Sequence, residues 1–181
     1  MRLTCFVDLD GVLVDFVAAA IATHKSPLKK RDVRWDVFEQ LGVSEAEFWR
    51  TKNYAWWLNL EWTDEGKELL AGVESIFGPE NVALMTHGRD ADCVVGKIGW
   101  VARNLPEYAG RLILTRAKHM AAGPGKFLID DHDENRMRFV LAGGVALTPP
   151  RPWNLRREEC DEEGRFDVKA FLNEVREEAE K

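Results

Sequence analysis

The chain has 181 residues, enough for one domain with a sizeable core, and its 45% apolar and 31% charged residues are typical of a folded globular protein. It carries 25 Lys and Arg against 31 Asp and Glu, a net charge of −6, so it lacks the broad basic field that binds duplex nucleic acid. The longest uncharged stretch of the second half, residues 139–150, is shorter than the ~18 apolar residues of a membrane span.

The cysteines and the N-terminal residues bear on the cellular compartment. Cys5, Cys93 and Cys160 are far apart and form no Cys-x-x-Cys pair, which predicts reduced thiols and neither a disulfide framework nor a zinc site. No apolar segment with a cleavage site precedes the first predicted strand. We therefore expect a cytoplasmic protein.

Short apolar runs alternate with helical patterns along most of the chain. The expected strands are residues 3–7, 81–85, 111–114, 127–129 and 144–147, and the expected helices are residues 16–24, 91–104, 134–141 and 168–179. Strands that alternate with helices predict an α/β fold, a Rossmann-like doubly wound parallel sheet, with ligands bound at the carboxyl ends of the strands.

Residues 17–76 interrupt this alternation, because they contain no convincing strand. Ser44 with Glu47 forms a capping box that predicts a helix, and Thr63 before two acidic residues predicts the start of another. We expect a small helical cap at residues 17–76, inserted after the first strand into a core of residues 1–16 and 77–181.

Acidic residues follow two of the predicted strands. Asp8 and Asp10 end the first strand, and Asp130 and Asp131 end the fourth. If these strands are neighbours, the carboxylates converge on one small volume, and an all-oxygen cluster of this kind suits Mg²⁺.

Two further polar residues occupy equivalent places. Thr86 ends the second strand and Lys118 follows the third. A hydroxyl, a lysine and a metal ion around one aspartate form a constellation suited to phosphoryl transfer. Each residue taken alone has a structural explanation, as a turn, a cap or a solvated side chain, but their order at successive strand ends favours the functional one.

This pattern resembles the haloacid dehalogenase superfamily of phosphohydrolases. Its four signatures are matched in order by Asp8-Leu9-Asp10-Gly11-Val12, Thr86, a lysine and Asp130-Asp131. The segments that further resemble the 5′(3′)-deoxyribonucleotidase family are residues 8–16, 49–54, 58–61, 97–101, 114–118, 128–131 and 152–154. Two departures stand out: His87 and Gly88 replace the small hydroxyl residue that commonly follows the signature threonine, and the lysine lies about two positions further from Asp130 than expected.

The resemblance implies a role for each signature residue. Asp8 would be the nucleophile and Asp10 the general acid and base, while Asp8, the main-chain carbonyl of Asp10, and Asp131 or Asp130 would bind Mg²⁺. Thr86, the amide of His87 and Lys118 would hold the phosphate. Lys126, directly before the fourth strand, competes with Lys118 for this role, and the His87 ring is either a substrate contact or an ordinary loop histidine. Lys97 and Arg116 receive no role.

Five of the seven tryptophans lie between residues 35 and 62, inside the expected cap. Phe16, Trp56 and Trp57 are candidates for binding a base, because stacking on an aromatic ring contributes ~1–3 kcal/mol with any base. The alternative is that these rings simply pack the core of a small cap.

The sequence therefore predicts a Mg²⁺-dependent phosphatase that hydrolyses (deoxy)ribonucleoside monophosphates through an aspartyl-phosphate. Its expected partner is a small phosphate ester, with no duplex nucleic acid and no membrane, and a homodimer is left open. The alternatives are the same chemistry on another small phosphate ester and a non-catalytic nucleotide-binding module.

Overall fold

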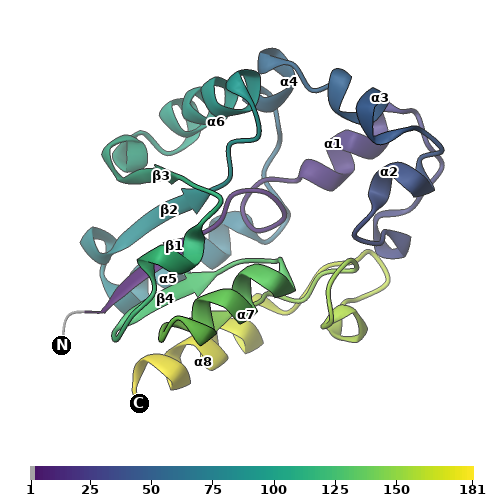
Figure 1. Cartoon of the computed structure of the whole chain (residues 1–181). Helices are drawn as coiled ribbons and strands as arrows, with labels where there is room; N and C mark the ends of the chain where they lie inside the picture. Colours follow the sequence, from purple (N-terminus) through teal and green to yellow (C-terminus); the bar gives the residue numbers. More distant parts are fainter. Residues whose placement is uncertain (1–2) are drawn as a thin grey trace.

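A five-stranded parallel sheet forms the centre of the computed structural model, which describes residues 3–181 (Figure 1). The order across the sheet is β3-β2-β1-β4-β5, so the first strand lies in the middle. The strands are β1 (Thr4–Val7), β2 (Val82–Thr86), β3 (Leu112–Leu114), β4 (Lys126–Ile129) and β5 (Val145–Leu147). Each end lies within one residue of its predicted position, and the predicted α/β class with a parallel sheet is confirmed.

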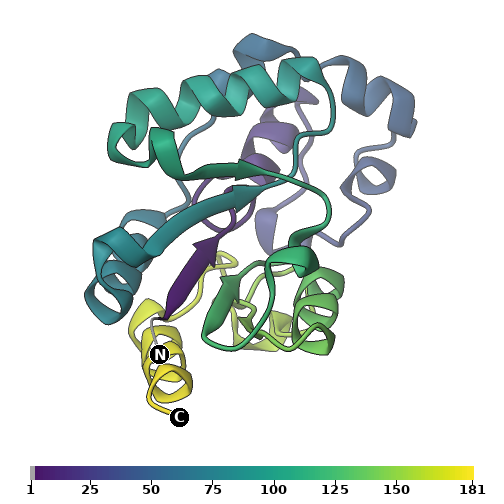
Figure 2. The ribbon, with the colours of Figure 1, turned by 60° about the vertical axis from the view of Figure 1, so that its left-hand side comes forward.

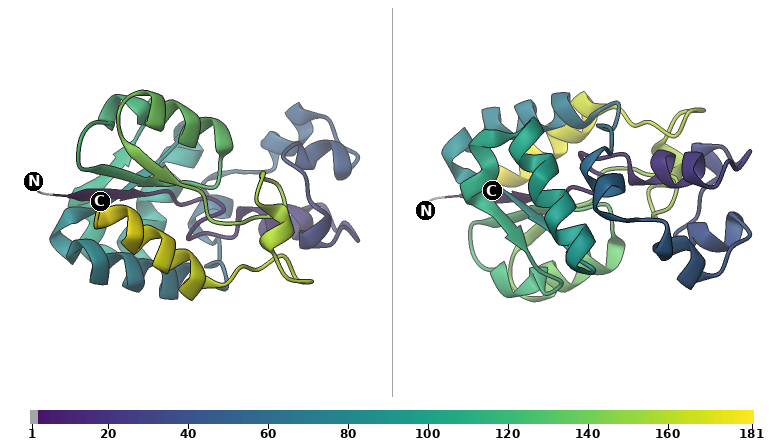
Figure 3. Two further views of the ribbon diagram at one scale, coloured as in Figure 1. Left: turned by 90° about the horizontal axis from the view of Figure 1, so that it is seen from below. Right: turned by 90° about the horizontal axis from the view of Figure 1, so that it is seen from above.

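Helices cover both faces of the sheet, which explains why its strands are mostly apolar. Cys5 and Val7 of β1 share one apolar cluster with helices α5 (Gly66–Phe77), α6 (Ala91–Asn104) and α8 (Val168–Ala179). Phe6, between them in the chain, points to the other face and packs with Phe139 of α7 (Asp133–Leu141). Figure 3 shows α7 and α8 on opposite sides of the sheet.

Short helices lie beyond the carboxyl ends of the strands (Figures 1 and 2). These are α1 (Phe16–Thr23), α2 (Val37–Gln40), α3 (Glu45–Arg50) and α4 (Tyr54–Leu58). The predicted capping box is present, since Ser44 Oγ accepts from Glu47 N at 3.3 Å and Glu47 Oε2 accepts from Ser44 N at 3.1 Å. Their core contains Val17, Val33, Val37 and Phe48, and α4 packs against α6.

Helix α5 differs from the prediction in two respects. It packs against β1, β2 and α8, so the part of the expected cap that covers the strand ends finishes before Gly66, and not at residue 76. It also begins three residues after Thr63, whose hydroxyl donates to the carbonyl of Val12 at 2.8 Å instead of capping the helix. A tertiary contact therefore overrides the local capping signal.

Short 3-10 turns connect several elements, at Lys30–Asp32, Pro79–Asn81, Pro106–Arg111, Lys118–Ala121 and Arg157–Glu159. Among residues 3–181, none of the helices has the length and apolar character needed to cross a membrane.

Candidate active site

The predicted acidic residues meet at the carboxyl ends of the central strands. Carboxylate oxygens of Asp8, Asp130 and Asp131 lie within 4.8 Å of one another, and all three residues are buried. Thr86 ends the neighbouring strand β2 and is fully buried. Strand order alone explains this convergence, because β1 lies between β2 and β4.

Lys118 provides the positive charge beside Asp8. Its Nζ lies 2.8 Å from Asp8 Oδ2 and 2.6 Å from Asp130 Oδ2, and its side chain is 2% exposed. Burial alone would lower the pKa of Lys118, but the attraction of Asp8 and Asp130 outweighs it and raises this pKa above the usual lysine range. The lysine is therefore a permanent cation at neutral pH.

Lys126, its competitor in the sequence, lies at the opposite end of the sheet. It begins β4, and its Nζ donates to Thr4 Oγ1 at 3.0 Å. Four residues of strand separate it from Asp130, roughly 13 Å at ~3.3 Å per residue. The geometry places Lys118, and not Lys126, beside the acidic cluster.

Lys97 is the central residue that sequence reasoning left without a role. Its Nζ donates to Asp10 Oδ2 at 2.5 Å, Thr86 Oγ1 at 2.9 Å and the carbonyl of His87 at 2.7 Å. A signal existed, because Lys97 follows Cys93 by four residues and precedes Trp100 by three, which puts it on the apolar face of α6. A lysine on a buried helix face needs a carboxylate partner, and here it is Asp10.

The pKa of Asp10 is raised, mainly by burial and further by Asp8, with Lys97 opposing the shift. This direction is the one that a general acid working near neutral pH requires. Its Oδ1 is buried and has no hydrogen-bond partner among the described residues. Burial also lowers the pKa of His87, with Arg116, Lys97 and Lys118 adding to the effect, which favours the neutral form of its ring.

The two successive aspartates after β4 have different surroundings. Asp130 is fully buried, and its oxygens accept from Lys118, Asn135 and the amide of His132. Asp131 lines the cleft above the strand ends, where Trp153 Nε1 donates to its Oδ2 at 2.6 Å. Asp131 is thus the one whose carboxylate faces the cleft, whereas Asp130 holds Lys118.

The donor set fits a divalent cation. Burial raises the pKa of Asp131 well above its usual range, and repulsion from Asp130 and Asp8 raises it further. Four carboxylates gather here against two lysines, which leaves an excess of two negative charges when all are ionised. A dication with oxygen ligands, such as Mg²⁺, offsets this excess.

A cleft of about 780 Å³ lies between the strand ends and the short helices, and it is lined by Asp8, Asp10, Thr86, His87, Lys118 and Asp131. Phe16 and Trp57 also line it, with ring centroids 5.6 Å apart in a stacked arrangement. Trp56 does not line it, because its ring packs edge-on against both and its Nε1 donates to Thr23 Oγ1 at 2.7 Å. Of the three predicted base-binding residues, the structure brings two to the cleft.

Two other cap tryptophans line the same cleft and were not predicted. Trp35 stacks on His132 with ring centroids 4.0 Å apart, and Trp35 is 52% exposed. Trp49 lies under the guanidinium of Arg89 at 4.3 Å. Both pairs join the cap to loops that follow β2 and β4, the strands that carry Thr86 and the aspartate pair.

Solved structures have a similar fold, although no protein-family model matches the chain and no curated protein gives a significant match. A hydrolase from Pseudomonas syringae is 15% identical, with a TM-score of 0.55 over 98% of this chain and 99% of its own. A putative haloacid dehalogenase-like hydrolase from Burkholderia xenovorans is 11% identical, with a TM-score of 0.51 over 90% and 87%.

The chain has a haloacid dehalogenase-like fold. At such low identity the likeness establishes the fold alone. A haloacid dehalogenase family enzyme from Bacteroides thetaiotaomicron, solved with magnesium and inorganic phosphate, is 16% identical, with a TM-score of 0.44 over 82% of this chain and 94% of its own. The narrower likeness to deoxyribonucleotidases stays a prediction.

Proposed function

We propose that this chain is a Mg²⁺-dependent phosphatase that hydrolyses (deoxy)ribonucleoside monophosphates to nucleoside and phosphate. The observation that carries the proposal is the pairing of Asp8 with Lys118 at 2.8 Å and of Asp10 with Lys97 at 2.5 Å, on the wall of one cleft. A module that only binds phosphate has no need for a second carboxylate two residues after the first.

In this mechanism Asp8 is the nucleophile. A carboxylate oxygen of Asp8 attacks phosphorus, the bond from phosphorus to the ester oxygen breaks, and Asp10 donates its proton to the departing alkoxide. Asp10 then takes a proton from water as that water attacks the aspartyl-phosphate, which releases phosphate and restores both carboxyl groups. The raised pKa of Asp10 supports its protonated starting form.

Charge neutralisation allows one anion to attack another. Lys118 lies beside Asp8, and Thr86 and the amide of His87 supply hydrogen bonds to the phosphate oxygens. Asp8, the main-chain carbonyl of Asp10 and Asp131 would hold a Mg²⁺ ion, which would supply Lewis acidity to the phosphoryl group. Asp130 takes part indirectly, since it fixes Lys118.

The nucleoside part of the substrate is assigned to the aromatic wall of the cleft. The volume of about 780 Å³ suits a mononucleotide, and Phe16 and Trp57 line the cleft from the cap side. Because Phe16 also contacts the rings of Phe48, Trp49 and Trp56, most of its surface packs the cap. This packing favours one second candidate, the same chemistry on a smaller phosphate ester.

Two assays test the proposal. Turnover of p-nitrophenyl phosphate with and without EDTA tests the chemistry, and the absence of EDTA-sensitive turnover would reject the phosphatase. A panel of nucleoside monophosphates and sugar phosphates tests the substrate class. We expect the highest kcat/KM for a nucleoside monophosphate, and a faster sugar phosphate would favour the second candidate.

A further inference from the structure

A buried turn follows β5 and lies between the two acidic loops. Its residues, Arg151, Pro152, Trp153 and Asn154, are all buried although three carry polar side-chain atoms. Buried polar groups are hydrogen-bonded in native proteins, so the partners of this turn show what it holds in place.

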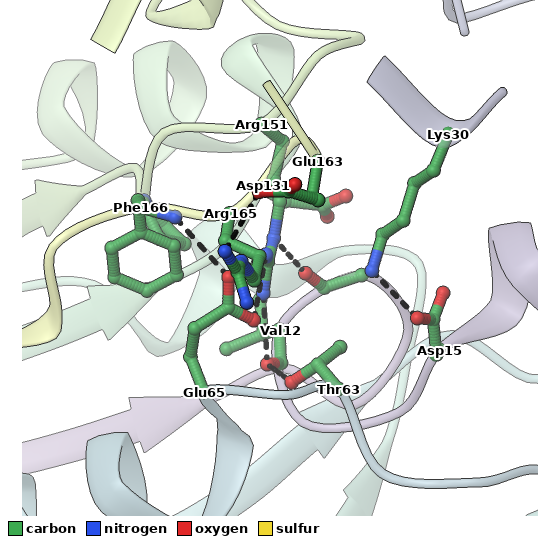
Figure 4. A network of polar contacts seen from close by, with 12 residues as sticks. Val12, Asp15, Lys30, Thr63, Glu65, Asp131, Arg151, Glu163, Arg165 and Phe166 are labelled. Carbon is green, nitrogen blue, oxygen red and sulfur yellow. Dashed lines mark hydrogen bonds and ion pairs between the residues drawn. The ribbon is translucent and has the colours of Figure 1, made fainter. Parts of the chain in front are cut away.

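Arg151 holds the loop that follows the Asp8–Asp10 segment. Its Nε donates to the carbonyl of Gly11 at 2.6 Å, and its Nη2 lies 3.4 Å from the carbonyl of Val12. Its Nη1 donates to both carboxylate oxygens of Glu65 at 3.0 Å. Figure 4 shows this guanidinium between Glu65 and the loop, with Thr63 contacting Val12 from the other side.

Trp153 and Asn154 hold the other acidic loop. Trp153 Nε1 donates to Asp131 Oδ2 at 2.6 Å, and Asn154 Nδ2 donates to the main-chain carbonyl of the same aspartate at 3.1 Å. The absence of a side chain at Gly11 leaves room for this hydrogen bond. A Cβ at position 11 would lie 2.1 Å from Asp131 Oδ2 and 3.2 Å from Trp153 Cζ2. The turn thus fixes both the main chain and the carboxylate of Asp131.

The indole ring of Trp153 also contacts the cap. It belongs to the apolar cluster formed by Val17, Val33, Val37 and Phe48. The ring of Trp153 therefore packs against the cap, while its N–H donates to a carboxylate of the core. Because the indole donates to Oδ2 of Asp131, this hydrogen bond restricts the rotation of a carboxyl group that lines the cleft.

We propose that Trp153 is a positioning residue for the cation site, which presents the Asp131 carboxylate in the orientation that binds a divalent metal ion. The inference rests on the metal-binding role that the proposed function gives to Asp131. Removal of a side chain that hydrogen-bonds to a metal ligand typically lowers the metal affinity by about 10- to 100-fold. Arg151 and Asn154 hold the same turn against the two loops.

The test compares two buried tryptophans, each of which donates a hydrogen bond from its indole N–H. Trp153→Phe keeps an apolar ring and removes the donor, and Trp100→Phe is the matched control, since Trp100 is 2% exposed and its Nε1 donates to the carbonyl of Leu60 at 2.7 Å. Mg²⁺ affinity is measured by calorimetry on each full chain. We expect the Mg²⁺ Kd to rise about 10- to 100-fold in Trp153→Phe and less than about twofold in Trp100→Phe. Equal changes in both variants, or none in Trp153→Phe, would overturn the proposal.

A second measurement needs no variant. In ¹H–¹⁵N spectra of the wild-type chain, the indole N–H resonance of Trp153 should shift when Mg²⁺ is added, while that of Trp100 should not. An unmoved Trp153 resonance under saturating Mg²⁺ would contradict the proposal. Neither readout depends on turnover, so a chain that shows both effects but hydrolyses no phosphate ester would refute the proposed function and leave this inference standing.

Discussion

Lys118 in the core and Lys52 in the cap are both buried, with 2% and 3% exposure, but they have opposite surroundings. Lys118 lies between the carboxylates of Asp8 and Asp130, which raise its pKa. The Lys52 ammonium lies 3.6 Å from the centre of the Phe48 ring and 3.1 Å from His24 Nε2, and burial lowers its pKa to about 8. Burial therefore lowers the pKa of Lys52, whereas the carboxylates beside Lys118 outweigh the same effect.

The two surroundings reflect how the two regions are built. At the strand ends, parallel strands bring several carboxylates to one place, and lysines from α6 and the loop after β3 balance part of their charge. In the cap, short helices contribute few apolar residues each, and aliphatic side chains and aromatic rings together form its core. We expect substitutions in the first region to change chemistry and those in the second to change substrate binding and stability.

The largest effect is expected for Asp8→Asn. The amide keeps the shape of the side chain but loses the nucleophile and one charge beside Lys118, so kcat should fall more than about a hundredfold, equivalent to ~2.7 kcal/mol. The measurement is kcat for p-nitrophenyl phosphate, with Asp92→Asn on the exposed side of α6 as the control. More than about a hundredth of wild-type activity in a folded Asp8→Asn variant would remove Asp8 from the nucleophile role.

The next effect separates the two lysines that the sequence left in competition. Lys118→Ala removes the cation beside Asp8, and kcat/KM should fall about a hundredfold, the usual scale for losing one charge-stabilising group. Lys126→Ala removes only a contact with Thr4 at the far end of β4, so its kcat/KM should stay within about twofold of wild type. Circular dichroism checks that both fold, and a larger loss in Lys126→Ala would reverse the assignment.

Substitution of the aromatic wall should affect nucleotides more than a small substrate. Phe16→Leu removes a ring along the cleft, and KM for a deoxynucleoside monophosphate should rise by about five- to a hundredfold, the scale of ~1–3 kcal/mol of stacking. Trp57→Phe keeps a smaller ring, so its KM should rise less. The kcat/KM for p-nitrophenyl phosphate should fall much less.

Trp56→Phe is the control within the same cluster, because Trp56 packs against both rings without lining the cleft. If all three variants fold and lose both activities in equal proportion, or lose neither, the rings only pack the cap and the nucleotide assignment has no physical support.

The smallest effect is a pH dependence of stability that arises from Lys52. Its folded-state pKa of about 8 lies below the ~10.4 of an unfolded chain, so between these values the unfolded state binds more protons and the free energy of unfolding rises with pH. Lys52→Met should lose this rise, which urea titrations from about pH 7 to about pH 10 would measure. The control is Lys169→Met, an exposed lysine of α8. Parallel pH profiles for wild type and Lys52→Met would show that the cap does not disfavour the charge.

Much of the fold was predictable because it depends on local pattern. The apolar runs are continuous where strands are covered on both faces, and helices α6 and α8 have the predicted bounds because their apolar residues recur at helical spacing. The start of α5 was not predictable in this way. Thr63 has the chemistry of a cap, but its hydroxyl bonds to Val12, 51 positions earlier in the chain.

The sequence by itself determined the order of chemical groups at the strand ends: Asp8 and Asp10, then Thr86, then Lys118, then the aspartate pair. Short spacing within a motif and strand alternation are enough for that, because parallel strands present their carboxyl ends at one edge. Only the tertiary structure placed Lys118 rather than Lys126 beside the acidic cluster, put Asp131 rather than Asp130 on the cleft lining, and brought Lys97, Arg151 and Trp153 to the acidic loops. These choices depend on where a side chain points and on contacts across 12 to 140 positions of chain, and no local pattern encodes either.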